Sequence, residues 1–169
     1  MKNIILIGFM GVGKGSVARE MIKQTQIVAL DTDDLIESME NRMIKKIFET
    51  DGEKYFREIE ARVAKWLEKS VENTLISTGG GFYKVKNLKK IGTVVFLDSP
   101  FDKIYERIVN HPKAQAKIKK RPLLQDLEKA RALYEERRPQ YKSLSDITID
   151  VTDKSVEKIV KEILKKVKL

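Results

Sequence analysis

A glycine-rich segment directly after an apolar run constrains this chain more than any other part of its sequence. The run Ile4-Ile5-Leu6-Ile7 has the character of a buried strand, and it precedes Gly8-Phe9-Met10-Gly11-Val12-Gly13-Lys14-Gly15-Ser16. Glycines at this spacing let the backbone curl, so that several N–H groups and a helix N-terminus point at one anion. Apolar residues at helical spacing follow the segment. The sequence therefore predicts a phosphate-binding loop between a strand and a helix, rather than a simple turn.

One position departs from the usual GxxxxGK(S/T) pattern of such loops. In that pattern the lysine contacts the outer phosphates of a nucleotide, and the hydroxyl that follows it coordinates magnesium. Here Lys14 is followed by Gly15, and the hydroxyl comes one position later, on Ser16. We expect a nucleotide to bind here with Mg²⁺, held by the loop residues Gly11, Val12, Gly13, Lys14, Gly15 and Ser16.

The rest of the chain alternates short apolar segments with amphipathic ones. Strands are predicted at 3–8, 27–30, 74–78, 93–97 and 148–151. Helices are predicted at 14–24, 44–69 with a break at Asp51-Gly52, 100–109, 125–138 and 155–166. Strands that are apolar throughout are typical of parallel sheets, and right-handed crossovers place helices on both faces. We expect a three-layer α/β fold around a five-stranded parallel sheet, as one domain over 1–169.

Composition excludes several classes of protein. The chain has no cysteine, hence no disulfide framework, which favours a cytoplasmic location. It shows no leader pattern and no apolar run of about 18 residues, so no membrane association is expected. Thirty-four basic and 25 acidic residues leave a net charge of +9, but the lysines come as scattered pairs. No nucleic-acid recognition module is present, so we expect anionic small molecules as partners and a monomer.

Further candidates lie at strand ends, because parallel sheets bind ligands beyond the carboxyl ends of their strands. Asp31 and Asp33 follow the second predicted strand and would point in different directions, one toward magnesium and one toward a second substrate. The alternative is that this aspartate cluster caps a helix, with Asp34 as the first candidate for the cap. Gly79, Gly80 and Gly81 follow the third strand, and three successive glycines indicate close approach by a ligand or a turn.

Two arginines outside the sheet are also candidates. Arg57 and Glu60 are neighbours on a predicted helix, so the carboxylate could fix the guanidinium, although an exposed ion pair is the alternative. Arg121 follows a basic, turn-prone stretch and is predicted to belong to a mobile lid over about 111–124. Such lids bring positive charge onto a transferring phosphoryl group.

Taken together, these motifs resemble those of the shikimate kinase family over nearly the whole length of the chain. The segments IILIGFMGVGK, DTDDLIE, IFETDGEKYFRxxE, STGGG, RPLL and ERRPQY resemble the signatures of that family in their order. The resemblance implies a P-loop fold like that of nucleoside monophosphate kinases. It also implies transfer of the γ-phosphoryl group of ATP to the 3-hydroxyl of shikimate, a step of the pathway to chorismate and aromatic amino acids.

The resemblance also implies roles for single residues. The region of about 33–62 would bind shikimate. Its hydroxyls would meet Asp33, and its carboxylate would meet Arg57 and Arg137, because a guanidinium fork matches a carboxylate. The other implied contacts are Gly79, Gly80 and Gly81 as backbone, Phe48 and Phe56 as apolar wall, Arg107 on adenine, and Arg121 on the phosphates. Lys14, Asp33 and Arg121 would be the catalytic residues, and Asp31, through water, with Ser16 would hold magnesium.

The chain departs from the family pattern at Gly15, where most members have Ser or Thr, and at Gln140, where they have leucine. Adenylate kinases also have glycine after the loop lysine. Arg107 could instead be a solvated helix residue. Gluconate kinases and nucleoside monophosphate kinases share the fold, and a nucleotide-binding protein without catalytic activity is a further alternative. A GTP-dependent switch is disfavoured, because no Asn-Lys-x-Asp motif is present.

Overall fold

Five parallel strands form the centre of the computed structural model, which describes residues 2–119 and 122–168. The strands are β1 (Asn3–Ile7), β2 (Val28–Asp31), β3 (Thr74–Ser77), β4 (Gly92–Asp98) and β5 (Ile147–Asp150). Their order in the sheet is β2-β3-β1-β4-β5, and each neighbouring pair is parallel. The predicted five-stranded parallel sheet is confirmed, and each strand ends within one residue of its predicted position.

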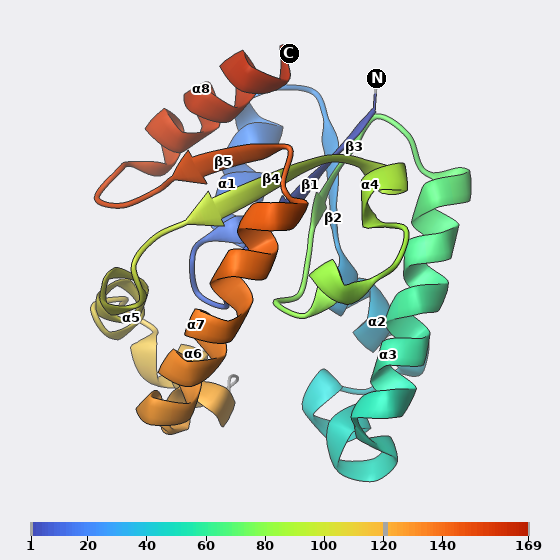
Figure 1. Ribbon diagram of the computed structural model, residues 1–169, viewed down its shortest axis with the longest axis vertical. Coiled ribbons are helices and arrows are strands. Elements are labelled where there is room, and N and C mark those ends of the chain that lie inside the picture. The colour runs from blue at the N-terminus through green and yellow to red at the C-terminus, as the bar shows by residue number, and fades with distance from the viewer. Residues whose placement is uncertain (1, 120–121, 169) are drawn as a thin grey trace.

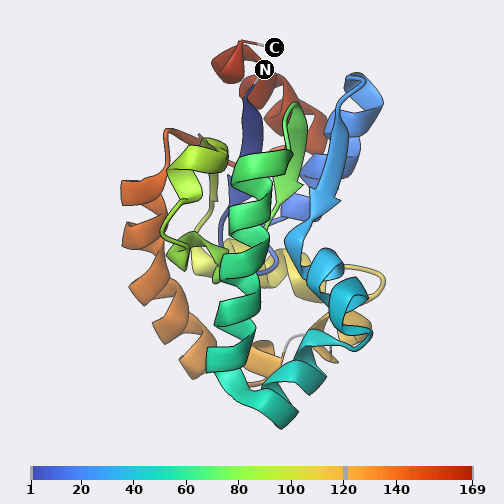
Figure 2. The ribbon, with the colours of Figure 1, turned by 90° about the vertical axis from the view of Figure 1, so that its right-hand side faces the viewer.

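Helices cover both faces of this sheet (Figure 1). On one face α1 (Lys14–Gln24) packs against α8 (Val156–Val167). On the other face lie α3 (Ile44–Ser70), α4 (Leu88–Ile91) and α7 (Leu127–Leu144), and Figure 2 shows α1 and α7 on opposite sides of the strands. Beyond the carboxyl ends of the strands lie α2 (Thr32–Glu40), α5 (Phe101–Val109) and α6 (Ala114–Lys119). Two 3-10 turns, η1 (Phe82–Lys84) and η2 (Pro122–Gln125), complete the described elements.

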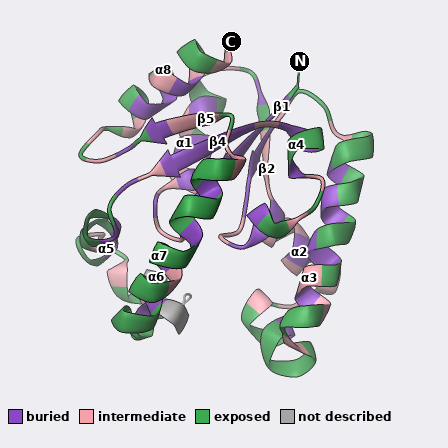
Figure 3. Ribbon diagram, viewed as in Figure 1, coloured by how far each residue is buried: buried purple, intermediate pink, exposed green. Residues whose placement is uncertain are grey.

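The core lies between the sheet and its two helical layers. All residues of β1 are buried, and Ile4 to Ile7 are at most 2% exposed (Figure 3). Burying one such side chain stabilises the fold by roughly 1.5–3 kcal/mol. The middle of the sheet is therefore rigid, and the loops beyond the strand ends are held on a fixed frame.

The aspartate cluster after β2 differs from the sequence prediction. Residues 32–40 form α2, a helix that the sequence analysis missed, and Asp33 lies in its first turn rather than in an extended segment. The N-cap is Asp31 and not Asp34: its Oδ1 accepts hydrogen bonds from the N–H groups of Asp33 at 2.9 Å and Asp34 at 3.3 Å. A side chain at the N-cap satisfies N–H groups that have no partner within the helix.

Helix α7 also differs from the prediction, which ended it at Arg138 before Pro139. The helix continues to Leu144 with Pro139 inside it, although proline removes one hydrogen bond of a helix. The last turns carry Tyr141, which is 1% exposed and packs against Phe96 at 5.4 Å between ring centroids. Burial of this ring offsets the lost hydrogen bond. The predicted break in the long helix is confirmed, since Gly52 inside α3 has φ 81°.

Candidate active site

The loop between β1 and α1 has the backbone shape that an anion site requires. Gly11 and Gly13 have φ of 83° and 110°, which residues with a side chain rarely adopt. The N–H of Val17 donates to the carbonyl of Gly13, so the first turn of α1 starts directly at the loop. The positive end of the helix dipole and the N–H groups of its first turn, which a helix cannot pair internally, therefore meet at the loop.

Lys14 lies over this loop and is 8% exposed. Its Nζ donates hydrogen bonds to the carbonyls of Gly8 at 2.7 Å and Phe9 at 3.2 Å. These carbonyls hold the ammonium group beside the N–H groups that would contact phosphate. The lysine can therefore add a full positive charge to the partial charges of the backbone.

The position after Lys14 has no steric need for glycine. Gly15 is helical, and the nearest atom to a Cβ placed there would be Nη1 of Arg19 at 3.5 Å, an ordinary contact distance. Ser16 follows in the same turn, and its Oγ lies 3.5 Å from Nη2 of Arg19. A serine side chain at position 15 would fit, so glycine there removes a hydroxyl without a gain in packing.

Asp33 lies close to the backbone that follows β3. A Cβ on Gly79 would collide with its carboxylate oxygens. Burial raises the pKa of Asp33 to about 7, and the negative charges of Asp31 and Glu60 act in the same direction, while Lys14 opposes them. A carboxyl group with a pKa near 7 can accept a proton at neutral pH and release it again.

The three glycines after β3 each lie against one functional side chain. Gly79 faces Asp33, a Cβ on Gly80 would lie 3.2 Å from Nη1 of Arg137, and one on Gly81 would collide with the guanidinium of Arg57. None of the three glycines has a positive φ. The turn that the sequence suggested is confirmed, because the N–H of Phe82 donates to the carbonyl of Gly79 at 3.1 Å. Close approach of the three side chains is a further reason for glycine here, and approach by a ligand stays a prediction.

Arg57 is held by two carboxylates of its own helix, α3. It pairs with Glu60 and, at 3.2 Å, with Glu53. Glu60 is 2% exposed, so the alternative of a solvent-exposed ion pair is wrong. The aromatic rings of Phe48 and Phe56 lie 4.8 Å apart at this side of the site, and the Arg57 guanidinium lies 5.4 Å from the Phe56 ring.

Arg137, on α7, is buried, and its charge interacts with that of Glu60 although no ion pair joins the two. It is 8% exposed, its Nε has no hydrogen-bond partner, and no carboxylate pairs with it within residues 2–119 and 122–168. A buried positive charge that lacks a partner is unfavourable, and a bound anion would relieve it. The sequence identified Arg137 as a candidate, whereas its burial and the unbonded Nε depend on how the folded chain packs.

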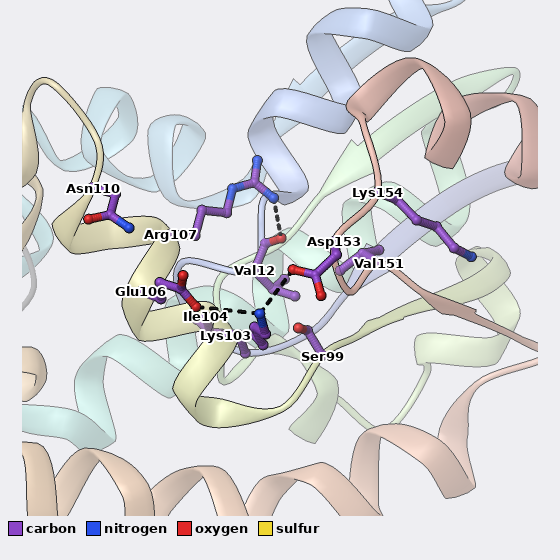
Figure 4. A pocket seen from close by; sticks show the side chains of 10 residues that line it. All are labelled: Val12, Ser99, Lys103, Ile104, Glu106, Arg107, Asn110, Val151, Asp153 and Lys154. Atoms are coloured by element: carbon purple, nitrogen blue, oxygen red, sulfur yellow. Dashed lines mark hydrogen bonds and ion pairs between the residues drawn. The ribbon is translucent and has the colours of Figure 1, made fainter.

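A cavity of about 330 Å³ adjoins the phosphate loop on the side of α5 (Figure 4). Arg107 contributes to it and donates from Nη1 to the carbonyl of Val12 at 3.1 Å. Arg107 is an exposed residue whose guanidinium bonds to the loop backbone, so its contact with adenine stays a prediction and a solvated helix residue stays the alternative. Lys103 bridges Glu106 at 3.6 Å and Asp153 at 3.1 Å on the cavity wall.

The segment after β5 also contributes to this cavity, which was not predicted from the sequence. Val151, Asp153 and Lys154 line it together with Ser99 and Asn110. The rule that sites follow the carboxyl ends of parallel strands applies to β5 as well and could have found this segment. In the predicted lid, residues 114–119 form α6 and not the turn-prone stretch that the sequence suggested. Arg121 lies outside the described residues, so its role and the mobility of the lid stay predictions.

The residues proposed for magnesium fit an ion that arrives with a nucleotide. No group of three or more His, Cys, Asp or Glu side chains in the described part of the chain could hold an ion by itself. Oδ1 of Asp31 already accepts two N–H groups, whereas Oδ2 accepts one hydrogen bond, from Ser77 at 2.7 Å, and keeps acceptor capacity for a water. Magnesium in kinases is commonly held by phosphates, waters and one or two carboxylates, which this donor set allows.

Comparison with known proteins assigns the chain to a family. The sequence model of the family described as shikimate kinase matches residues 10–168. The chain belongs to the shikimate kinase family. It is 40% identical to the shikimate kinase of Helicobacter hepaticus over 164 residues, 97% of this chain and 95% of the relative. It is 42% identical to that of Lactococcus lactis over 169 residues, 97% of each chain.

A solved structure of the same family supports the fold at the level of coordinates. The shikimate kinase from Acinetobacter baumannii in complex with shikimate superposes with a TM-score of 0.86 at 32% identity, over 99% of this chain and 93% of that one. The resemblance drawn from the order of six motifs is confirmed by these matches. Among the described residues, no helix is both long and apolar enough to cross a bilayer.

Proposed function

We propose that this protein transfers the γ-phosphoryl group of ATP to the 3-hydroxyl of shikimate, giving shikimate 3-phosphate and ADP. One observation carries the proposal beyond family membership. Asp33, Arg137 and Arg57 converge on three successive glycines, and a Cβ on Gly80 would lie 3.8 Å from the backbone nitrogen of Met10 in the phosphate loop. A carboxylate and two guanidinium groups thus lie next to the place where ATP presents its phosphates.

ATP would occupy the loop and the cavity beside it. The N–H groups of residues 11–16 would bind the phosphates, and Lys14 would exchange the carbonyls of Gly8 and Phe9 for phosphate oxygens. Adenine would enter the cavity against Arg107, whose guanidinium is fixed by the Val12 carbonyl. Arg121, from the lid, would add a second positive charge at the phosphates.

Shikimate would bind between α2, α3 and α7. Arg57 and Arg137 would take its carboxylate, and the rings of Phe48 and Phe56 would form an apolar wall. Asp33 would accept a hydrogen bond from the 3-hydroxyl and orient its oxygen toward the γ-phosphorus. As the oxygen–phosphorus bond forms and ADP leaves, the hydroxyl proton would pass to Asp33, whose pKa near 7 allows its later release to water.

Magnesium bound with ATP would supply neutralisation of the phosphate charge. Within this chain Asp31 would reach it through water, and Ser16 is the nearest hydroxyl of the loop, because Gly15 has none. Positioning and charge neutralisation would thus dominate catalysis. A monomer in the cytoplasm is the assembly and location that the sequence favours.

The acceptor is tested by an ADP-release assay with ATP and Mg²⁺ that offers shikimate, gluconate and nucleoside monophosphates in parallel. ADP release with shikimate alone is expected. Activity with gluconate or a monophosphate in its place would assign another acceptor. Release with none of the acceptors would favour a nucleotide-binding protein without catalytic activity.

A further inference from the structure

Two buried polar groups behind the acceptor side of the site lack a hydrogen-bond partner in the part of the chain that the structure describes. They are the hydroxyl of Tyr83, in η1, and Nε of Arg137, in α7. Tyr83 is 3% exposed and Arg137 is 8% exposed. Buried polar groups are nearly always paired in folded proteins, so two such groups in one site call for an explanation.

The two groups belong to one cluster behind Gly80. The rings of Tyr83 and Tyr141 meet edge to face with centroids 4.9 Å apart, and the Tyr141 hydroxyl donates to the Gly80 carbonyl at 2.6 Å. Nη1 of Arg137 lies against the same glycine. Burial raises the pKa of Tyr83, and the charge and N–H groups of Arg137 oppose that rise, as expected for adjacent groups.

We propose that Tyr83 is a positioning residue of the acceptor site. Its hydroxyl oxygen accepts a hydrogen bond from Nε–H of Arg137 when the acceptor carboxylate is bound, and this bond turns Nη1 and Nη2 of the guanidinium toward that carboxylate. A guanidinium has five N–H donors, and a carboxylate accepts two of them in parallel. When Nε–H is bonded to another group, the carboxylate binds end-on, to one N–H of Nη1 and one of Nη2. The inference rests on the proposed function, in which Arg137 binds the carboxylate of shikimate.

A neutral partner suits Arg137 better than a carboxylate would. Arg57 is paired with Glu60 and Glu53, which cancel much of its charge. Arg137 has no such pair in the described chain, so it keeps its charge for the ligand. The Tyr83 hydroxyl stays protonated at neutral pH, because burial raises its pKa, and it can orient the guanidinium without neutralising it.

The test is the Tyr83→Phe variant, which removes one oxygen and keeps the ring against Tyr141. We expect KM for shikimate to rise about tenfold or more, the gain typical of a hydrogen bond to a charged group, with kcat and KM for ATP within twofold of wild type. The melting temperature of the free protein should stay equal or rise, because an unpaired hydroxyl leaves the core. Tyr105→Phe, on α5, is the matched control and should change neither KM for shikimate nor the melting temperature.

Two further measurements separate positioning from packing. The first is the ratio of kcat/KM for shikimate to kcat/KM for its neutral carboxamide. In Tyr83→Phe this ratio should fall by the same factor as kcat/KM for shikimate itself. In an Arg137→Lys background, which has no Nε–H, Tyr83→Phe should have no additional effect. Three results would overturn the inference. They are an unchanged selectivity for shikimate over the carboxamide, additive effects of Tyr83→Phe and Arg137→Lys on KM for shikimate, and a lower melting temperature of Tyr83→Phe with unchanged KM for shikimate. Wild-type protein inactive with shikimate would contradict the proposed function instead, before Tyr83 is tested.

Discussion

The two ends of the site bind their ligands in different ways. At the nucleotide end, residues 8–16 supply backbone N–H groups, a helix N-terminus and Lys14 from one short segment. At the acceptor end, Asp33, Arg57 and Arg137 come from α2, α3 and α7 and meet at the glycines after β3. The first end depends on local backbone conformation, and the second depends on how distant elements pack.

The electrostatics of the two ends differ as well. Lys14 is paired with carbonyl groups of its own loop. The acceptor end holds both signs of charge, with the half-buried Asp33 at a pKa near 7 and the buried Arg137 in no ion pair within the described chain. Changes of pH should therefore affect activity mainly through the acceptor end. Removal of a single positive charge should affect activity most at the nucleotide end.

The largest effect is expected at the nucleotide end. Lys14→Met should lower kcat by about a thousandfold or more, because the charge that neutralises the transferring phosphoryl group is lost. Shikimate binding, measured by calorimetry without ATP, should stay within about threefold, since Arg57 and Arg137 are untouched. Lys23→Met, on the exposed side of the same helix, serves as control. A comparable loss of shikimate affinity would mean that the two ends are not independent.

Asp33→Asn is expected to have the next largest effect. It should lower kcat at least about a hundredfold, because asparagine cannot accept the hydroxyl proton, while shikimate binding stays nearly normal. For wild type, kcat/KM should fall as the pH drops below about 7, where the free Asp33 carboxyl becomes protonated. Steady-state rates between pH 5.5 and 8.5 check both statements. A near-wild-type rate in the variant would remove Asp33 from proton transfer.

The same residue links pH to stability. The pKa of Asp33 rises from 3.8 to about 7 on folding, so the folded state holds a proton that the unfolded state has released. Its contribution to stability therefore falls as the pH rises from about 4 to 7 and is constant above that range. Asp33→Asn should stabilise the free protein at pH 8 by on the order of a few kcal/mol and much less at pH 5. Denaturant unfolding at both pH values measures this, and equal effects would contradict the raised pKa.

Arg57→Lys tests whether the acceptor end can be changed without an effect on nucleotide binding. Lysine keeps the charge but loses the planar fork that pairs with carboxylates, so KM for shikimate should rise by roughly ten- to thirtyfold. KM for ATP should not change, because the phosphate loop lies on another element. Arg62→Lys, an exposed position of the same helix, is the control. Equal changes in both KM values would show that the substitution disturbs the whole site.

The smallest effect is expected for Gly15→Ser, which restores a hydroxyl after the loop lysine. The site has room for it, since the nearest atom to a Cβ is 3.5 Å away. The free Mg²⁺ concentration for half-maximal rate should fall by about three- to tenfold, because one more oxygen can coordinate the ion. ADP affinity in the presence of EDTA should stay the same. An unchanged magnesium requirement would mean that Gly15 causes no coordination deficit.

Helix α2 and helix α7 show where sequence patterns were insufficient. Residues 31–34 have the composition of a loop or a cap, and only the bonds from Asp31 to the next turn and to Ser77 show which aspartate caps the helix. Pro139 suggested a helix end, but the buried Tyr141 keeps the helix intact beyond it. In both places a tertiary contact overrides a local preference.

The glycine-rich loop and the apolar strands were determined by the sequence itself, because backbone conformation at glycine and burial of β-branched residues act over a few neighbouring residues. Their order along the chain also sufficed for the family. The tertiary structure alone decided that Gly79, Gly80 and Gly81 each face one charged side chain. It also decided that the Tyr83 hydroxyl and Nε of Arg137 are buried with no hydrogen-bond partner among the described residues. Those properties depend on desolvation and on groups more than twenty residues apart, which no local pattern encodes.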